Sequence, residues 1–493
     1  MIAAHYPALQ IALPLIAAPL CVLLRRGTWA WLVTVAVSWT ALYVSVQLLL
    51  QVLASGPISY ELGGWAAPWG IEYRVDSVNA FVLLIVSGIS AISAPYAYKS
   101  VIHEIPEHQH YLFYSAYLLC LTGLLGIVIT GDAFNVFVFL EISSLSSYVL
   151  ISLGKDRKAV TAAYQYLVMG TIGATFFLIG VGLIYAMTGT LNMADIANRI
   201  DLVQNTRTVL AAFAFITVGL GLKLALFPLH LWLPNAYAYA PSVVTVFLAA
   251  TATKVAIYTM LRFVFTLFGT DFALDVTLLA QFLMALALVG VFAASITAIF
   301  QNNIKRMLAY SSVAQVGYMM LGVSFFSVTG LTGGIVHLFN HAMMKGALFM
   351  ALGAIFFRVG SVHIDRIRGL GKQMPFTMFA FVIGGLSLIG IPLTVGFISK
   401  WYLILAALER GWWPIAGLVL LSSLLAIVYV WRVVEVAYFR DPPTNHPKVT
   451  EAPLSLLVPT WILVLANIYF GVDTTLTVGV ADTAAKVLLG LGQ

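Results

Sequence analysis

Three groups that can bind a proton lie four residues apart within one apolar stretch. The segment HLFNHAMMKG (337–346) places His337, His341 and Lys345 between GGIV and ALFMALGAIFF. Four-residue spacing puts all three on nearly the same face of a helix, with about 6 Å between neighbours. Histidine has an unperturbed pKa close to neutrality and two ring nitrogens through which a proton can pass. The pattern therefore indicates proton transfer along a helix.

Other ionisable side chains also lie deep inside apolar segments. A charge at the centre of a bilayer costs roughly 2.5–3.5 kcal/mol on insertion scales, so such residues are expected to be functional. Burial disfavours the charged forms of lysine and of carboxylates, which brings both closer to proton exchange near neutral pH. Together with the three residues of 337–345, they form a candidate proton relay of Glu141, Lys223, Lys254, His337, His341, Lys345 and Lys400.

Each of these residues also has a structural interpretation. Lys254 or Lys400 could extend along its apolar surroundings to the membrane interface. Glu141 could be a salt-bridge partner that locks two helices together. His337 and His341 could be neutral histidines hydrogen-bonded to backbone or to serine. Two histidines aligned with a lysine favour the relay over this last reading.

The composition predicts an all-α polytopic membrane protein. Hydrophobic residues make up 61% of the 493 residues and charged residues only 9%, with a mean hydropathy of +0.98. Soluble domains carry about 25% charged residues. The apolar residues form continuous blocks of about 20, long enough to cross a bilayer core, whereas barrel strands alternate over about ten. The formal charge of +6 is scattered over short loops, so nucleic acid is not an expected partner.

The two cysteines do not indicate a redox centre. Cys21 and Cys120 lie in separate apolar segments and cannot supply a four-thiolate cluster or a zinc pattern. We therefore expect no metal, no cofactor and no redox or hydrolytic site in this chain. The N-terminus lacks a basic region before its first apolar run, so no cleavable signal peptide is expected.

About fourteen membrane-spanning segments can be placed along the chain. They lie near 8–24, 28–53, 77–98, 111–130, 133–153, 160–187, 209–231, 242–268, 276–300, 304–325, 330–357, 375–408, 413–438 and 452–472. The last twenty residues form a weaker apolar tail, which we expect at the membrane interface.

Loop charges predict the orientation. Most basic residues fall in the loops after odd-numbered segments, which the positive-inside rule places in the cytoplasm. With fourteen segments, both termini are then extracytoplasmic, and we expect the inner membrane of a prokaryote. The basic residues of these loops are Arg25, Arg26, Lys99, Lys155, Arg157, Lys158, Lys305, Arg306, Arg358, Arg366, Arg368, Lys372, Arg440 and Lys448.

Two segments contain helix breakers. KLALFPLHLWLP (223–234) carries Pro228 and Pro234, and GGLSLIGIPLTVGFISKWYL (384–403) carries Pro392. The two lie five segments apart and so in opposite orientations, as in transporters built from inverted repeats. His230, in the first of them, fits either packing or a point of proton uptake near the cytoplasmic end.

Six blocks of sequence together resemble a known superfamily. They are FVFLE (137–141), LKLALFPLHLWLP (222–234), ATKVAIY (252–258), QNNIKRMLAYSSVAQVGYM (301–319), HLFNHAMMKGALF (337–349) and GFISKWYL (396–403). In this order, over roughly residues 75–440, they resemble the antiporter-like subunits of the respiratory complex I and Mrp antiporter superfamily. KRMLAYSS and HLFNHAMMK are the distinctive blocks, whereas FVFLE alone is weak.

The resemblance implies a fold and a division of the chain. It implies fourteen helices, two inverted five-helix repeats, and breaks in helices 7 and 12. The expected divisions are 1–105 for helices 1–3, 106–272 for the first repeat, 273–440 for the second, and 441–493 for helix 14 and the tail. The implied partners are other membrane subunits, with H⁺ as the transported ion and Na⁺ left open.

The resemblance also implies roles for the buried residues. Glu141 resembles the glutamate that pairs with the lysine of the broken helix, here Lys223, and Lys254 resembles the lysine that passes protons onward. The file 337–345 matches the central relay, and Lys400 resembles the lysine from which the proton leaves.

Two subtypes fit the chain. Its length and Lys400 match the D-type member of an Mrp sodium/proton antiporter and the N-type member of complex I, and WLPNAYAYAPS favours the former. Asn303 departs from the family, which often carries an acid there that could neutralise Lys305 or Arg306. A redox-driven pump and a stand-alone solute transporter remain alternatives.

Overall fold

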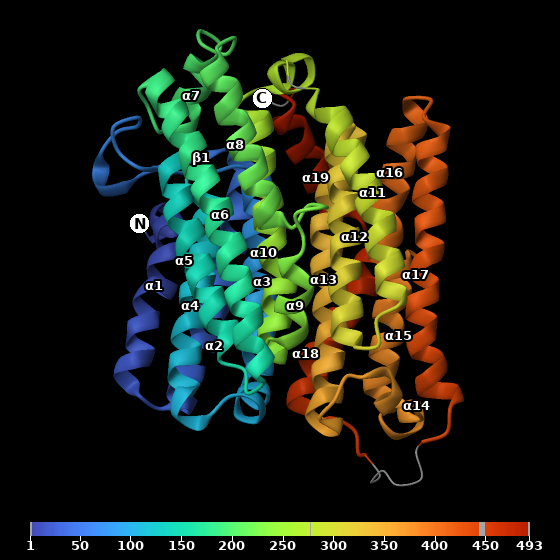
Figure 1. The fold of residues 1–493 in the computed structure, drawn as a ribbon. Helices are drawn as coiled ribbons and strands as arrows, with labels where there is room; N and C mark the ends of the chain where they lie inside the picture. The colour runs from blue at the N-terminus through green and yellow to red at the C-terminus, as the bar shows by residue number, and fades with distance from the viewer. Residues whose placement is uncertain (1, 277, 443–448, 492–493) are drawn as a thin grey trace.

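The computed structural model describes residues 2–276, 278–442 and 449–491 and shows a bundle of helices along one common axis (Figure 1). Within these residues, twelve helical segments are long and apolar enough to cross a membrane. Lys448 lies outside the described residues. The long helices are α1 (Tyr6–Leu24), α2 (Gly27–Ser55), α3 (Ser77–Glu104), α4 (His110–Ile129), α5 (Ala133–Ser152), α6 (Arg157–Thr188), α8 (Arg207–Leu224), α10 (Ser242–Leu261), α11 (Leu279–Ile299), α12 (Ile304–Ser324), α13 (Val328–Val359), α17 (Trp413–Phe439) and α18 (Leu454–Val472).

Shorter elements complete the bundle. The short helices are α7 (Met193–Ile200), α9 (Trp232–Tyr239), α14 (Leu370–Gln373), α15 (Pro375–Ile389), α16 (Val395–Glu409) and α19 (Thr475–Leu488). Single turns are η1 (Ile2–His5), η2 (Leu62–Gly64), η3 (Glu107–Gln109) and η6 (Ile364–Ile367), with wider, π-helical turns at η4 (Arg262–Leu267) and η5 (Phe272–Val276). Strands β1 (Ile58–Glu61) and β2 (Glu72–Val75) pair antiparallel, with Ile58 opposite Val75.

Polar side chains mark where the buried helices begin. Asp76, Asp132, Asn303 and Ser327 each accept a hydrogen bond from a backbone N–H in the first turn of α3, α5, α12 and α13, respectively. The first N–H groups of a helix have no partner within it, and a side-chain oxygen at this position satisfies one or two of them. These short polar residues therefore define the helix starts within an apolar sequence.

The span predicted at 209–231 is interrupted near the middle of the bundle. Helix α8 ends before Ala225, whose backbone is left-handed (φ 60°), and Pro228 follows without an N–H to continue the helix. The chain becomes helical again at α9, which includes Pro234 in its first turn, where proline is tolerated. Pro228 thus lies in the interruption, whereas Pro234 lies within the second half-helix.

The span predicted at 375–408 is likewise two helices. Helix α15 ends at Ile389, Gly390 adopts φ 92°, and Pro392 lies in the gap before α16. Figure 1 shows α8 above α9 but α15 below α16, so the two broken spans run in opposite directions. Helix α8 is already among the twelve segments, so α12 and the span of α15 and α16 complete the expected all-α fold of about fourteen spans in the described residues. The boundaries between the two repeats stay a prediction.

Helix α13 is the centre of the bundle. It packs against α3, α10, α12, α15, α16, α18 and α19. Its residues from Gly330 to Ile355 are all buried. The helix that carries the histidine–lysine file is therefore shielded from lipid on every side along most of its length.

The C-terminal tail forms a helix that packs into the bundle, and its position relative to the membrane interface stays a prediction. Helix α19 packs against α13 and α3, and Ala481, Ala484 and Ala485 are buried in that contact. Small side chains allow this close approach. The chain end lies at the upper end of the bundle in Figure 1, opposite the α1–α2 turn.

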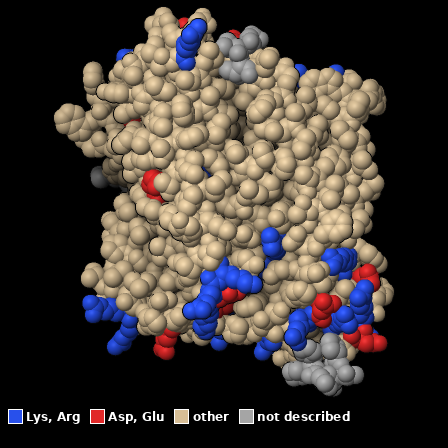
Figure 2. Space-filling model, in the orientation of Figure 1, with Lys and Arg blue, Asp and Glu red and all other residues tan. Residues whose placement is uncertain are grey.

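Charged side chains gather at one end of the bundle. Figure 2 shows Lys and Arg concentrated along the lower edge of the visible face, while the middle band is almost free of them. The lower end in Figure 1 holds the α1–α2 turn, which carries Arg25 and Arg26. This is the distribution expected of a membrane protein with a basic loop face on one side.

Two glycines of α6 give a matched test of the α6–α8 packing. A methyl group at Gly180 would lie 2.5 Å from Ile216 Cγ1 and 2.8 Å from Ala212 O of α8, whereas nothing lies within 4 Å of one at Gly182. We expect Gly180→Ala to lower the free energy of unfolding by about 1–3 kcal/mol through overpacking, and Gly182→Ala to leave it unchanged. Thermal unfolding in detergent measures both; equal midpoints would contradict the packing.

Candidate functional site

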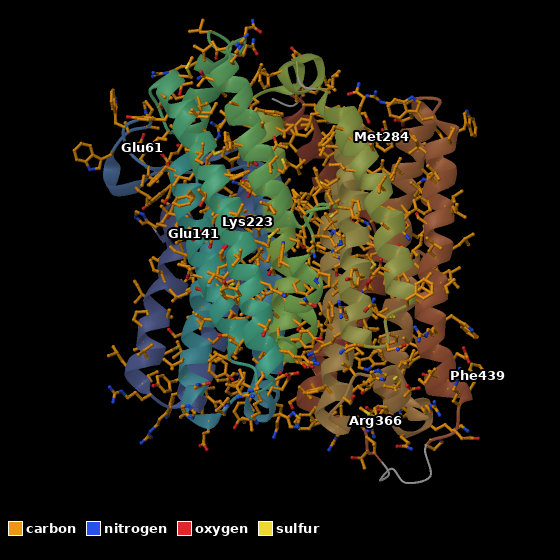
Figure 3. The ribbon with its side chains drawn as sticks, viewed as in Figure 1. Glu61, Glu141, Lys223, Met284, Arg366 and Phe439 are labelled. Atoms are coloured by element: carbon orange, nitrogen blue, oxygen red, sulfur yellow. The ribbon has the colours of Figure 1, made fainter. Side chains whose placement is uncertain are left out.

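Glu141 of α5 and Lys223 of α8 form an ion pair. Lys223 Nζ lies 3.8 Å from Glu141 Oε1, and it donates a hydrogen bond of 2.7 Å to Ser144 Oγ. Figure 3 shows the two side chains next to each other halfway along the bundle. The Lys223 side chain is buried, while 27% of the Glu141 side chain is exposed on the lateral surface. At 3.8 Å the pair is held by charge and not by a hydrogen bond.

A small cavity lies between Lys223 and α10. Its volume is about 20 Å³, and Ser143, Ser144, Ser147 and Lys223 line it together with Ala252 of α10. This volume accommodates about one water molecule, and the serine hydroxyls and the lysine supply the polar partners that a buried water requires. The cavity therefore provides a polar step from Lys223 towards the helix that carries Lys254.

Lys254 is completely buried in α10. Its Nζ donates hydrogen bonds to the carbonyl oxygen of Ala249 and, at 3.3 Å, to Thr253 Oγ1. It therefore does not reach a membrane interface, which was the alternative for this residue. Helix α10 packs directly against α13, so Lys254 belongs to the helix that separates Lys223 from the central file.

The central file lies along α13 as its spacing predicts, but its members have different partners. His337 Nδ1 lies 2.7 Å from Ser399 Oγ and its Nε2 lies 2.8 Å from Gln315 Oε1. His341 is fully buried, and among the described residues no protein atom forms a hydrogen bond with either of its ring nitrogens. The two rings are almost parallel, with centroids 6.1 Å apart.

Lys345 ends the file on the other side of His341. Its Nζ donates to the carbonyl oxygen of Leu308 at 2.8 Å and to Ser311 Oγ. Both acceptors belong to α12. His341 therefore lies between two groups that are bonded to neighbouring helices.

Lys400 lies at the break between α15 and α16. Its Nζ donates to the carbonyl oxygen of Ile389 at 2.7 Å, to that of Leu388 at 3.3 Å and to Ser423 Oγ at 2.9 Å. These carbonyls end α15, where the helix dipole is negative and the last oxygens have no partner within the helix. The break therefore supplies the acceptors that hold this ammonium group inside the bundle.

His230 lies in the interruption between α8 and α9. Its ring stacks on Phe227 with centroids 5.2 Å apart and meets Tyr310 edge-on, and its Nδ1 has no hydrogen-bond partner. The residue is buried. The packing interpretation of His230 accounts for its ring contacts, whereas its role in proton uptake stays a prediction.

Sequence reasoning missed the polar partners of the relay. Ser144, Ser311, Gln315, Ser399 and Ser423 each contact one of the predicted lysines or histidines. The signal for some of them was present in EISSLSS (141–147) and AYSSVAQ (309–315), which place hydroxyl and amide groups within apolar spans. A serine that bonds its own helix looks the same in sequence, so the pattern alone does not select these residues.

Asn303 has a structural role that an acid could also fill. Its side chain caps α12 by accepting a hydrogen bond from the backbone N–H of Arg306. Lys305, which an acid at this position could neutralise, instead donates to Ala240 O at 3.2 Å and to Ser242 Oγ at 3.1 Å. The departure at Asn303 therefore leaves Lys305 with partners. Among the described residues, no group of three or more His, Cys, Asp or Glu side chains is placed to hold a metal ion.

The chain matches a family of membrane transport proteins. Residues 130–426 match the family described as NADH:quinone oxidoreductase/Mrp antiporter, TM, which is more than half of the 493 residues. The chain belongs to this family. The matched part contains the candidate relay from Glu141 to Lys400.

Relatives of both predicted subtypes are similar to this chain along almost its entire length. The N-type component of the NADH-quinone oxidoreductase of Desulforudis audaxviator is 41% identical, covering 95% of this chain and 96% of the relative. The D-type component of the Na(+)/H(+) antiporter of Bacillus subtilis is 31% identical, covering 98% and 97%. A protein of the Mrp complex from Dietzia sp. DQ12-45-1b superposes with a TM-score of 0.90 at 27% identity, covering 99% and 98%.

Replacing the buried lysines by methionine should have unequal effects on stability. Lys345→Met removes a buried ammonium without leaving a charge behind, because its partners are a hydroxyl and a carbonyl. Lys223→Met leaves Glu141 unpaired. Removing one partner of a fully buried ion pair lowers the free energy of unfolding by ~3–5 kcal/mol. We expect a smaller loss here because Glu141 is partly exposed. We expect Lys345→Met to match or exceed the wild-type thermal midpoint and Lys223→Met to fall below it.

The double variant Lys223→Met/Glu141→Gln is the control for this comparison. It removes the orphaned carboxylate and should recover the midpoint that Lys223→Met loses. A midpoint as low as that of the single variant would show that the loss comes from lost packing of the lysine and not from the unpaired charge.

Proposed function

We propose that the chain moves protons across the membrane through a relay from Lys223 to Lys400. The observation that carries the proposal is the central file of α13: His337, His341 and Lys345 are fully buried at successive turns of one helix, with His341 between the other two. The ring of His341 is almost parallel to that of His337, with centroids 6.1 Å apart. An imidazole between two proton-binding groups can take a proton from one neighbour and pass it to the other through its two nitrogens.

The Glu141–Lys223 pair is the device that starts the transfer. A carboxylate close to an ammonium favours the charged form of the lysine. When the pair separates, Lys223 holds its proton less firmly and releases it towards α10. When the pair closes, Lys223 binds a proton again. The 3.8 Å separation and the partial exposure of Glu141 support a contact that opens and closes.

The transfer then follows the buried groups in order. The small polar cavity beside Lys223 leads to α10 and Lys254, and the α10–α13 contact leads to the central file. His337 bonds Ser399, whose neighbour in the chain, Lys400, ends the relay. We place proton uptake on the cytoplasmic side and release near Lys400.

The chain works within a multisubunit membrane assembly that exchanges a cation for protons. The support is the similarity to a component of an Na(+)/H(+) antiporter and to a protein of an Mrp complex. Part of the Glu141 side chain is exposed on the lateral surface, where a neighbouring protein of the assembly can act on it. We place both termini on the extracytoplasmic side of a prokaryotic inner membrane, on the basis of the basic loops.

A redox-driven pump is the second candidate function. The relative that is 41% identical is named as the N-type component of an NADH-quinone oxidoreductase. In that case the same relay moves protons, but electron transfer in other subunits drives the Glu141–Lys223 pair. Purified native assembly in liposomes separates the two: a sodium gradient that generates a pH gradient supports the antiporter, and pH change only on addition of electron donor and quinone supports the pump.

Lys223→Ala should abolish proton transport while the assembly still forms. The variant removes the group that both accepts the proton and pairs with Glu141. A pH-sensitive dye in vesicles measures transport, and co-purification of the other subunits measures assembly. Lys372→Ala, an exposed lysine of α14, is the control and should transport like the wild type. Wild-type transport by Lys223→Ala would refute the relay.

A further inference from the structure

A pocket with charged lining residues lies next to α7, at the upper end of the bundle in Figure 1. Lys400 is not among its lining residues. The volume of the pocket is about 520 Å³, and β2, α3, α7, α10 and α19 all contribute to its wall. Glu72, Arg74, Asp76 and Arg262 bring four charged side chains to it. None of the predicted relay residues lines this pocket, and sequence reasoning had placed only Glu141 among the acids of the membrane interior.

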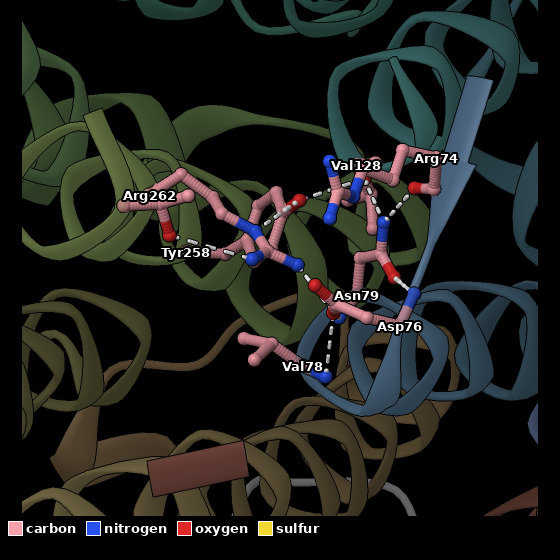
Figure 4. A network of polar contacts seen from close by, with 8 residues as sticks. Arg74, Asp76, Val78, Asn79, Val128, Tyr258 and Arg262 are labelled. Atoms are coloured by element: carbon pink, nitrogen blue, oxygen red, sulfur yellow. Dashed lines mark hydrogen bonds and ion pairs between the residues drawn. The ribbon is translucent and has the colours of Figure 1, made fainter. Parts of the chain in front are cut away.

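The pocket contains a buried ion pair tied to a tyrosine (Figure 4). Arg262 donates to Asp76 Oδ1, and its Nε donates to the Tyr258 hydroxyl at 3.0 Å. The Tyr258 hydroxyl in turn donates to Val128 O at 2.8 Å, and Asn79 Nδ2 donates to the same oxygen at 3.2 Å. This cluster connects α3, α4 and α10 at one level of the bundle.

The spacing of this cluster links it to the relay. Lys254 and Tyr258 lie four residues apart in α10, and Arg262 follows after four more as the first residue of η4, so the three lie on nearly one face with about 6 Å between neighbours. Tyr258 lines the pocket and Lys254 does not. The pocket therefore reaches a residue one helical turn from Lys254 along α10, while the Lys254 amine is directed the other way, to the carbonyl oxygen of Ala249.

A purely structural role accounts for only part of this arrangement. Asp76 caps α3 by accepting from the N–H groups of Val78 and Asn79, and its pair with Arg262 locks α3 to α10. Apolar side chains of similar size would hold two helices together at least as well as a buried ion pair. Holding the two helices together requires neither a pocket that reaches Tyr258 nor the four-residue spacing between Tyr258 and Lys254.

We propose that this pocket is an access route for protons, here called the port, at the upper end of the bundle. The Tyr258 hydroxyl and the Asp76–Arg262 pair separate the port from Lys254. When Arg262 swings out of the pair and the Lys254 side chain turns from Ala249 O towards Tyr258, water in the pocket meets the Lys254 amine. The ammonium of Lys254 gives one proton to that water, and the neutral amine is reloaded from the relay. The inference rests on the proposed function and adds an access route separate from Lys400.

A cysteine placed in the pocket tests the port in the intact assembly. Ala197 of α7 lines the pocket, whereas Leu202 is 87% exposed and lies outside it. The native residues Cys21 and Cys120 are buried and do not compete for reagent. Ala197→Cys and Leu202→Cys are each labelled in proteoliposomes with a membrane-impermeant trimethylammonium thiosulfonate, and labelling is measured by mass spectrometry.

The port predicts a severalfold loss of proton flux when Ala197→Cys is labelled, because the reagent fills the pocket and adds a positive charge. Labelled Leu202→Cys should keep the flux of its unlabelled form. Unchanged flux after complete labelling of Ala197→Cys overturns the port. The relay itself is tested by Lys223→Ala. If labelling of Ala197→Cys does not change the proton flux, the port is refuted but the proposed function is not.

Asp76→Asn tests the gate separately from the fold. Asparagine still accepts the N–H groups at the start of α3 and so keeps the cap, but it removes the charge that holds Arg262. An open gate predicts a faster decay of an imposed pH gradient in vesicles that contain the variant than in wild-type vesicles. A decay equal to that of the wild type refutes the gate, and a lowered thermal midpoint without added leak assigns the pair to structure alone.

Discussion

A buried ammonium group needs hydrogen-bond acceptors from the protein itself, and this requirement organises the bundle. Lipid offers no acceptors, and regular helices use nearly all of their carbonyls internally. The chain meets the need in two ways. At the break after α15, the terminal carbonyls bind Lys400. Elsewhere, serine hydroxyls from a neighbouring helix bind Lys223 and Lys345. Lys223, Lys345 and Lys400 therefore also link neighbouring helices, whereas Lys254 bonds a carbonyl and a hydroxyl of its own helix.

The location of the relay on α13 follows from the same requirement. A polar file is least costly where protein surrounds it, and α13 contacts seven other helices. Close approach at its start depends on glycine: a methyl at Gly322 of α12 would lie 2.7 Å from Gly330 O, and one at Gly334 would lie 3.1 Å from Met319 O. Helix α19 covers a further side of α13. Its small residues suit it to that place.

The two ends of the relay differ in their electrostatics. Lys223 faces a carboxylate that stabilises its charge, whereas the partners of Lys400 are two carbonyls and one hydroxyl, all neutral. A charged partner that moves changes the affinity of Lys223 for a proton strongly. Fixed neutral dipoles at a helix end hold the charge of Lys400 steadily. The two lysines therefore differ in whether a charged or a neutral group is their partner, and only the partner of Lys223 is partly exposed on the lateral surface.

The sequence by itself determined the helical class, the approximate spans and the two breaks, and it supplied the candidate relay residues, because hydropathy, proline and isolated charges are local signals. The aligned histidines of α13 are an example, since helical spacing alone places them on one face. Only the tertiary structure decided which of them is satisfied: His337 has Gln315 and Ser399, and His341 has neither. It also brought Asp76 to Arg262, 186 residues away. Such contacts depend on how helices from distant parts of the chain meet, and no local pattern encodes that.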